Sequence, residues 1–100
     1  MTIELKVKQR TYLKSKAHSL KPVVWIGKKG LNEEVLEAIE EAFSADELLK
    51  VKVHESAPVD RKKVGFELAE KLDCAFVQVI GRILVLYRPF PEEPQITLPL

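Results

Sequence analysis

The sequence predicts a compact α/β domain with a mixed four-stranded sheet. Segments with helical spacing and short apolar runs follow one another in the order helix–strand–helix–strand–helix–strand–strand. Strands joined through helices favour parallel pairing, and the last two apolar runs are separated by only Gly81 and Arg82, which favours an antiparallel hairpin. With 100 residues, we expect a single domain over residues 1–100, with a core at about 6–89 and a proline-rich tail at 89–100.

The first helix is expected from about Lys6 to Ser19, a segment without glycine or proline. Residues at helical spacing give it one inward side, and Pro22 ends it because the residue before a proline resists the helical region. The inward positions are the aliphatic stem of Arg10, Leu13, Ala17 and Leu20.

A strand follows at Val23–Ile26, and its continuous apolar character predicts burial on both faces, with Trp25 in the core. Gly27–Gly30 then turns the chain. Asn32 is the expected N-cap of a second helix that carries acidic residues in its first turn. The inward stripe of this helix is Val35, Leu36, Ile39, Ala42 and Phe43.

The run Leu48–Val53 alternates apolar and basic residues, which predicts a half-exposed strand. Its inward residues are Leu49, Val51 and Val53, and Lys50 and Lys52 point to the other face. A loop and a third helix from about Val59 to Leu72 follow, with Val64, Leu68 and Leu72 facing inward and Gly65 weakening the helical pattern.

The last two strands are "AFVQVI" and "ILVLYR", and the glycine-first turn between them suits type II′. The tail "PFPEEPQITLPL" holds four prolines in twelve residues, so we expect it to be irregular, with its apolar ending docked on the body.

Composition indicates an ordinary soluble protein, with 46% apolar and 31% charged residues. No apolar run approaches the length of about 18 residues that a transmembrane helix needs, and no secretory signal is recognised. A lone cysteine, Cys74, excludes an internal disulfide and suits a reducing compartment, so we expect a cytoplasmic protein. The chain is expected to be monomeric, because no heptad pattern is present.

Charge is strongly segregated along the chain. Residues 1–30 hold eight basic groups and one acid, a net charge of +7, and residues 31–49 hold seven acids and no base, a net charge of −7. We therefore expect one positive and one negative surface.

Signals for catalysis are weak, and no cofactor is indicated. His18, His54 and Cys74 lie far apart without metal-ligand spacing, and no G-x-S-x-G elbow occurs. The segment "GKKG" at residues 27–30 also departs from the phosphate-loop and dinucleotide-binding patterns. We expect a binding protein rather than an enzyme.

The same "GKKG" segment is the best candidate for a binding site. Glycines let the backbone approach a phosphate closely, and Lys28 and Lys29 supply positive charge. A basic stripe at every fourth position of the first helix leads through the next residues to this loop, and Tyr87 is a more credible stacking residue than Trp25. The candidate residues for binding a nucleic-acid backbone are Gly27, Lys28, Lys29, Gly30, Lys6, Arg10, Lys14, Lys21, Arg82 and Arg88.

Three segments together resemble a known family: "AHSLKPVVWIGKKGLNEEVLEAIEEAF", "ELLKVKV" and "VQVIGRILVLYR". They are similar to the CRM domain (chloroplast RNA splicing and ribosome maturation), in its free-standing bacterial, YhbY-like form. The resemblance runs from about Thr11 to Pro89, and the tail lies outside it.

The resemblance implies a fold similar to the C-terminal domain of bacterial translation initiation factor three, with an added N-terminal helix. It also implies RNA binding through a GxxG loop compared to that of KH domains, and association with precursors of the large ribosomal subunit. The loop glycines of the family fall on Gly27 and Gly30, its basic pair on Lys28 and Lys29, its hairpin glycine on Gly81 and its last arginine on Arg88. The alternative is a protein-interaction adaptor that uses the acidic outer face of the second helix.

Overall fold

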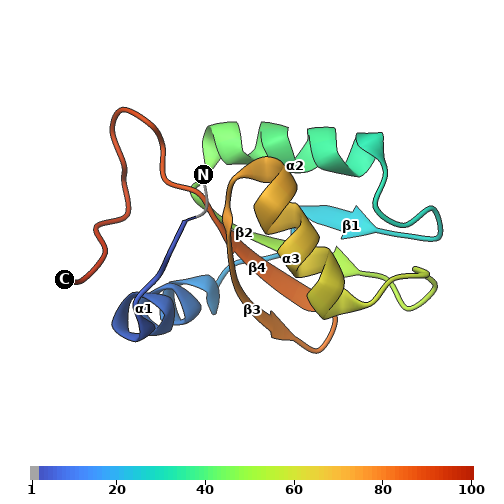
Figure 1. Cartoon of the computed structure of the whole chain (residues 1–100), viewed down its shortest axis with the longest axis horizontal. Helices are drawn as coiled ribbons and strands as arrows, with labels where there is room; N and C mark the ends of the chain where they lie inside the picture. Colours follow the sequence, from blue (N-terminus) through green and yellow to red (C-terminus); the bar gives the residue numbers. More distant parts are fainter. Residues whose placement is uncertain (1–2) are drawn as a thin grey trace.

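Four strands form one mixed sheet in the order β1-β2-β4-β3 (Figure 1). The computed structural model describes residues 3–100. Strand β1 runs parallel to β2, and β4 runs antiparallel to both β2 and β3, so the expected mixed sheet is confirmed. The elements are α1 (Val7–Ala17), β1 (Val24–Ile26), α2 (Glu33–Ala45), β2 (Leu48–Val53), α3 (Arg61–Leu72), β3 (Ala75–Ile80) and β4 (Ile83–Tyr87), in the predicted order.

Helices α2 and α3 cover one face of the sheet and form the main core with it. The alternation predicted for β2 is confirmed, because Leu49, Val51 and Val53 are buried in this core. The inward spacing of α3 is confirmed as well, through Val64, Leu68 and Leu72.

Helix α1 packs on the opposite face, where Leu13 and Ala17 contribute to a second, smaller core. Leu48, Val85 and Tyr87 lie beneath it. Tyr87 is only 3% exposed, so its proposed role as a stacking residue is wrong: α1 and the chain tail bury the end of β4.

Helix α1 is shorter than predicted and ends at Ala17, with His18 as its C-cap residue. Leu20 is exposed rather than inward-facing. Beyond this end, the ammonium of Lys50 donates hydrogen bonds to the carbonyl oxygens of His18 (3.4 Å) and Leu20 (3.0 Å) and ties the linker to β2.

Strand β1 differs most from its prediction. It is an edge strand, and only Val24 and Ile26 face the core. Trp25 is 57% exposed and Val23 is 48% exposed, so burial on both faces is wrong. The cause is that, within residues 3–100, no helix covers the outer face of the sheet at this position.

A side-chain cap fixes the first residue of both α2 and α3. Asn32 caps α2 as predicted, its side chain accepting a hydrogen bond from the Val35 amide at 3.0 Å. Asp60 caps α3 by accepting from the Lys63 amide, which places the start of α3 two residues after the predicted one. Inside α3, a Cβ at Gly65 would lie 2.5 Å from the ring of Phe76, so the absence of a side chain there makes room for that ring.

The turn between β3 and β4 agrees with the predicted type II′ geometry. Gly81 has a φ of 57°, and Arg82 is not among the residues with positive φ. The two strands pair in antiparallel register, with an irregularity between Phe76 and Gln78.

The proline-rich tail has no regular structure and docks on the body, as expected. Ile96 and Leu98 pack against the core beneath α1, and the Gln9 side-chain amide donates to the Pro99 carbonyl at 3.1 Å. The carboxylate of Glu47 accepts hydrogen bonds from three tail amides. Glu47 is 3% exposed, so it does not belong to the negative surface to which its sequence position had assigned it.

Candidate nucleic-acid interface

Three connections meet at one end of the sheet, and two of them form the right-hand tip in Figure 1. The β1–α2 loop contacts the β2–α3 loop, where the His54 amide donates to the Ile26 carbonyl at 2.8 Å. The β3–β4 turn joins them, since the Val53 amide donates to the Arg82 carbonyl at 2.7 Å. Residues distant in sequence therefore form one surface, which we call the loop end.

The GKKG segment is a tight turn at this end. The Gly30 amide donates to the Gly27 carbonyl at 2.9 Å, and Gly30 adopts a φ of 67°, which favours glycine. Gly30 is buried against the β2–α3 loop, and a Cβ there would meet the Val59 side chain at 3.4 Å. Lys28 and Lys29 are exposed. The turn thus holds two ammonium groups outward on a packed base.

Further basic residues lie on the hairpin side of the loop end. Arg82 is 47% exposed and has only a long ion pair with Glu55, at 3.9 Å. The guanidinium of Arg61 donates to the Gly81 carbonyl and ties the start of α3 to the hairpin turn. A polar groove of about 630 Å³ lies between that helix start and the hairpin turn, and Lys62 lines it.

Lys52, Arg61 and Lys62 were not among the sequence candidates. The run "RKK" at 61–63 is visible in the sequence. Its place at the loop end could not be predicted, because it depends on the contact between the β2–α3 loop and the β1–α2 loop. Lys52 was recognised only as the outward side of a strand.

The N-terminus of α2 adds little positive potential to the loop end. Asn32 occupies the Val35 amide, and the exposed carboxylates of Glu33 and Glu34 lie in the first helical turn. These acids offset the helix dipole at this end. Positive charge at the loop end therefore comes from lysine and arginine side chains.

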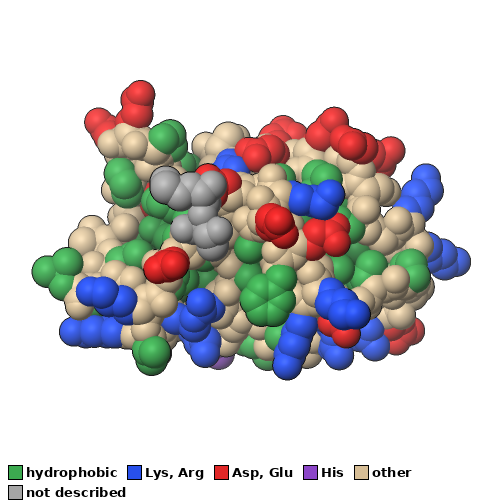
Figure 2. Space-filling model, in the orientation of Figure 1, with side chains coloured by type: hydrophobic (Ala, Val, Ile, Leu, Met, Phe, Trp, Pro, Cys, Tyr) green, Lys and Arg blue, Asp and Glu red, His purple; other side chains and the backbone are tan. Residues whose placement is uncertain are grey.

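Figure 2 shows the charge segregation on one face of the molecule. Acidic side chains gather along the top, over α2, and basic side chains gather at the right-hand tip and along the lower edge. The expected positive and negative surfaces are thus separated in space.

The basic candidates on α1 lie toward the other end of the sheet. Lys6 and Lys14 are exposed, and so is Lys21 in the connection to β1. Arg10 has another role, because its guanidinium donates to the carbonyls of Phe76 (2.8 Å) and Val77 (2.6 Å) on the edge strand β3. This side chain joins α1 to the sheet and is not presented to solvent like its lysine neighbours.

Arg88 is likewise engaged within the fold, far from the loop end. Its guanidinium forms a two-point ion pair with Glu40 (2.9 and 2.6 Å) and donates to the Leu72 carbonyl at 2.9 Å. It also lies over the Phe43 ring, 4.6 Å from the centroid. The hydrogen bond from Arg88 lowers the pKa of Glu40, and the same bond raises the pKa of Arg88. These contacts connect α2, α3 and β4.

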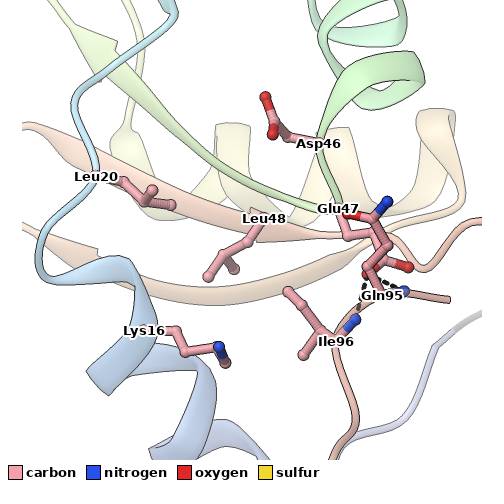
Figure 3. Close-up of a pocket in the computed structure, with 7 residues that line it drawn as sticks. All are labelled: Lys16, Leu20, Asp46, Glu47, Leu48, Gln95 and Ile96. Carbon is pink, nitrogen blue, oxygen red and sulfur yellow. Dashed lines mark hydrogen bonds between the residues drawn. The ribbon is translucent and has the colours of Figure 1, made fainter.

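A pocket of about 220 Å³ lies between α1, the start of β2 and the tail (Figure 3). The Glu47 carboxylate at its wall accepts from the amides of Gln95 (2.9 Å) and Ile96 (2.7 Å), and outside this view from that of Phe90 (2.6 Å). All three bonds hold the tail. The carboxylate is occupied by the fold itself, and we assign it a structural role.

Cys74 is fully buried at the entrance to β3, and burial raises the pKa of its thiol to about 12. Over residues 3–100, no three His, Cys, Asp or Glu side chains gather as a metal site. No helix in this part of the chain has the length and apolarity needed to cross a membrane.

Comparison with known proteins gives one consistent family. The model of the CRS1 / YhbY (CRM) domain matches residues 5–88. A Haemophilus influenzae protein named "RNA-binding protein" is 45% identical over 95 residues, which are 95% of each chain. The Bacillus subtilis protein named "Probable RNA-binding protein YqeI" is 40% identical over 92 residues, 92% of this chain and 96% of that protein.

The solution structure of SAV1595 from Staphylococcus aureus has the same fold. It superposes with a TM-score of 0.82 at 38% identity, covering 96% of this chain and all of the other. The relatives, the structural neighbour and the family model agree over nearly the whole length. The chain therefore belongs to the CRS1 / YhbY (CRM) domain family.

Proposed function

We propose that this chain binds RNA through the loop end and does so without catalysing a reaction. The observation that carries the proposal is the GKKG turn, in which Lys28 and Lys29 are exposed and Gly30 is packed against the β2–α3 loop. Such ammonium groups neutralise phosphates and give affinity that depends on salt. The RNA-binding names of close relatives support the same reading.

The RNA target that we propose is ribosomal RNA in precursors of the large ribosomal subunit, bound in the cytoplasm by one copy of the chain. Lysine contacts to phosphate give little choice of base, so recognition of a folded RNA rests on its shape and its 2′-hydroxyl groups. Arg82 extends the contact on the hairpin side, and Lys21, Lys6 and Lys14 extend it along α1.

The test is a fluorescence anisotropy titration with labelled fragments of large-subunit ribosomal RNA, unrelated structured RNA of equal length, and duplex DNA. The variant is Lys28→Ala with Lys29→Ala. The control, Lys8→Ala with Lys71→Ala, removes the same charge from exposed positions on α1 and the last turn of α3.

The loop variant is expected to weaken RNA binding and to flatten the log–log salt dependence by about 1.4 to 1.8, since each phosphate contact contributes about 0.7 to 0.9. The control variant is expected to keep the wild-type slope within about 0.5. Equal slopes for the two folded variants would refute the role of the loop, and equal affinity for all three nucleic acids would refute the ribosomal target.

A second candidate function is favoured by the acidic surface of α2. Glu33, Glu34, Glu37 and Glu41 are exposed there, whereas Glu40 is paired with Arg88. This face suits a basic protein partner. Glu37→Lys with Glu41→Lys should abolish capture of a basic ribosomal protein and leave RNA affinity unchanged or raised. If the variant still captures the basic protein in a pull-down, the adaptor function of this surface is excluded.

A further inference from the structure

A row of side chains crosses the open face of the sheet beside the loop end. The strand register places Trp25 next to Lys52, Lys52 next to Ile83, and Ile83 next to Ile80. Paired residues on neighbouring strands point to the same side of a sheet. Trp25 is 57% exposed, Ile80 is 54% exposed, Lys52 is exposed and Ile83 is half-buried. We call these four residues the open row.

The open row lies beyond the part of this face that α1 covers. Leu13 and Ala17 of α1 pack on Leu48, Val85 and Tyr87, which lie where β2 begins and β4 ends. The open row lies where β2 ends and β4 begins. The same sheet face is therefore closed by a helix at one end and open at the other, next to the loops.

Trp25 is an unusual residue to leave in this position. It is the only tryptophan of the chain, and burying its large apolar surface against α1 would have been favourable. Instead it stands at the sheet edge and also lines a hollow of about 330 Å³ between β1 and α2. A flat aromatic ring exposed on an edge strand is an available surface for another planar group.

The charge around Trp25 selects the kind of partner. Lys52 is its cross-strand neighbour, and Lys28 and Lys29 follow three and four residues later along the same segment. Gly27, between Trp25 and these lysines, has open space where a side chain would stand. The backbone of Gly27 is thus open to close approach by an anionic chain that contacts both the lysine turn and the aromatic ring.

We propose that Trp25 stacks on an unpaired RNA base, with Lys52 contacting the adjoining phosphate, while Lys28 and Lys29 hold the neighbouring backbone. Stacking on an aromatic side chain tolerates any base and needs an unpaired nucleotide. This inference rests on the proposed function and makes it narrower: the preferred target is a junction where single-stranded RNA continues from a structured element.

The sole tryptophan reports directly on this contact. The probes are a single-stranded RNA of about ten nucleotides, which matches the site sizes of such surfaces, and a blunt duplex of the same sequence. Binding is followed by anisotropy of the labelled RNA and, in parallel, by the emission of Trp25. The variants are Trp25→Leu, which keeps an apolar side chain without the ring, and Trp25→Phe, which keeps a ring.

We expect single-stranded RNA to quench Trp25 emission with the same Kd that anisotropy gives. Trp25→Leu should weaken binding of the single strand by about 5- to 150-fold and leave duplex binding unchanged, since one stacked base corresponds to that range. Trp25→Phe should recover most of the affinity. Thermal unfolding of each variant checks that β1 remains folded.

Two failures are distinguishable. If anisotropy reports RNA binding while Trp25 emission is unchanged and Trp25→Leu binds like wild type, stacking is refuted and the proposed function stands. If wild type binds neither RNA at low salt, the proposed function itself is refuted. Sedimentation that shows a dimer lost in Trp25→Leu would assign the open row to a second copy and overturn the RNA contact.

Discussion

The replacement Glu47→Gln tests how much the Glu47 carboxylate contributes to docking of the proline-rich tail on the domain. Glu47 is buried, and its two oxygens accept from three backbone amides: Phe90 at 2.6 Å on one oxygen, Gln95 at 2.9 Å and Ile96 at 2.7 Å on the other. Glutamine has the same shape but replaces one acceptor with a donor. In its better orientation the amide group faces the Phe90 amide, and that bond is lost.

The magnitude follows from these three contacts. Hydrogen bonds to a charged group contribute about 1.5 to 3 kcal/mol each, against about 1 kcal/mol for neutral ones. Losing one such bond and reducing two others to neutral strength therefore weakens tail docking by about 2.5 to 7 kcal/mol. Because Ile96 and Leu98 are only partly buried, their packing does not replace this loss, and the tail should open locally before the sheet unfolds.

Native-state hydrogen exchange measures this opening at the three amides. The lower limit of about 2.5 kcal/mol corresponds to a roughly 70-fold fall in their protection, with amides of β2 and β4 changing much less. Glu41→Gln, at an exposed position of α2, is the matched control and should change nothing. Protection of the Phe90, Gln95 and Ile96 amides that stays within about threefold of wild type would show that the carboxylate does not hold the tail.

Three further outcomes are expected. Arg88→Ala should lower the free energy of unfolding by about 1 to 3 kcal/mol, chiefly because the Leu72 carbonyl loses its hydrogen-bond donor. Urea titrations should show that the difference in unfolding free energy between wild type and variant narrows as the pH falls below 4.5. The reason is that Glu40, whose pKa is lowered by Arg88, loses its contribution when it is protonated. Gly65→Ala should destabilise the protein despite a helix-propensity gain of about 1 kcal/mol, because the new Cβ would lie 2.5 Å from the Phe76 ring. In chemical denaturation, adding Phe76→Leu should recover the lost stability. If Gly65→Ala alone stabilises the protein, the clash is contradicted. The Cys74 thiol, with its pKa raised to about 12, should react with a thiol reagent only after unfolding, so rapid labelling of native protein would show that it is accessible.

Sequence patterns predicted the elements well because their signals are local. The inward residues of β2, the Asn32 cap and the glycine-first hairpin turn each depend on neighbours within a few positions, and the structure confirms them. Their physical causes, side-chain alternation, an unsatisfied helix amide and a positive φ, act over the same short range.

The predicted burial of Trp25 and the predicted exposure of Tyr87 were both wrong because each depends on contacts between segments far apart in sequence. Exposure of Trp25 depends on β1 being the edge strand, and burial of Tyr87 depends on α1 and the tail closing over β4. A short apolar run in the sequence predicts neither the order of the strands in the sheet nor the packing of α1 and the tail. A run of apolar letters looks the same in a central strand and in a three-residue edge strand.

For the candidate site, the sequence indicated the outward lysines of the GKKG turn but not what surrounds them. Glycines on both sides of Lys28 and Lys29 predict a surface turn from local chemistry alone. The position of Arg61 against the hairpin turn and of Lys52 beside Trp25 arises from contacts between segments far apart in sequence. Arg10 shows the converse, since a basic residue in an exposed-looking stripe is held by two backbone carbonyls of β3.

The bond between Gln9 and Pro99 brings residues 90 positions apart to the same side of the molecule, away from the loop end. Among the described residues, α1 and the last part of the tail therefore lie together, on the side opposite the lysine turn. A module attached after the tail would begin on that side and leave the lysine turn accessible.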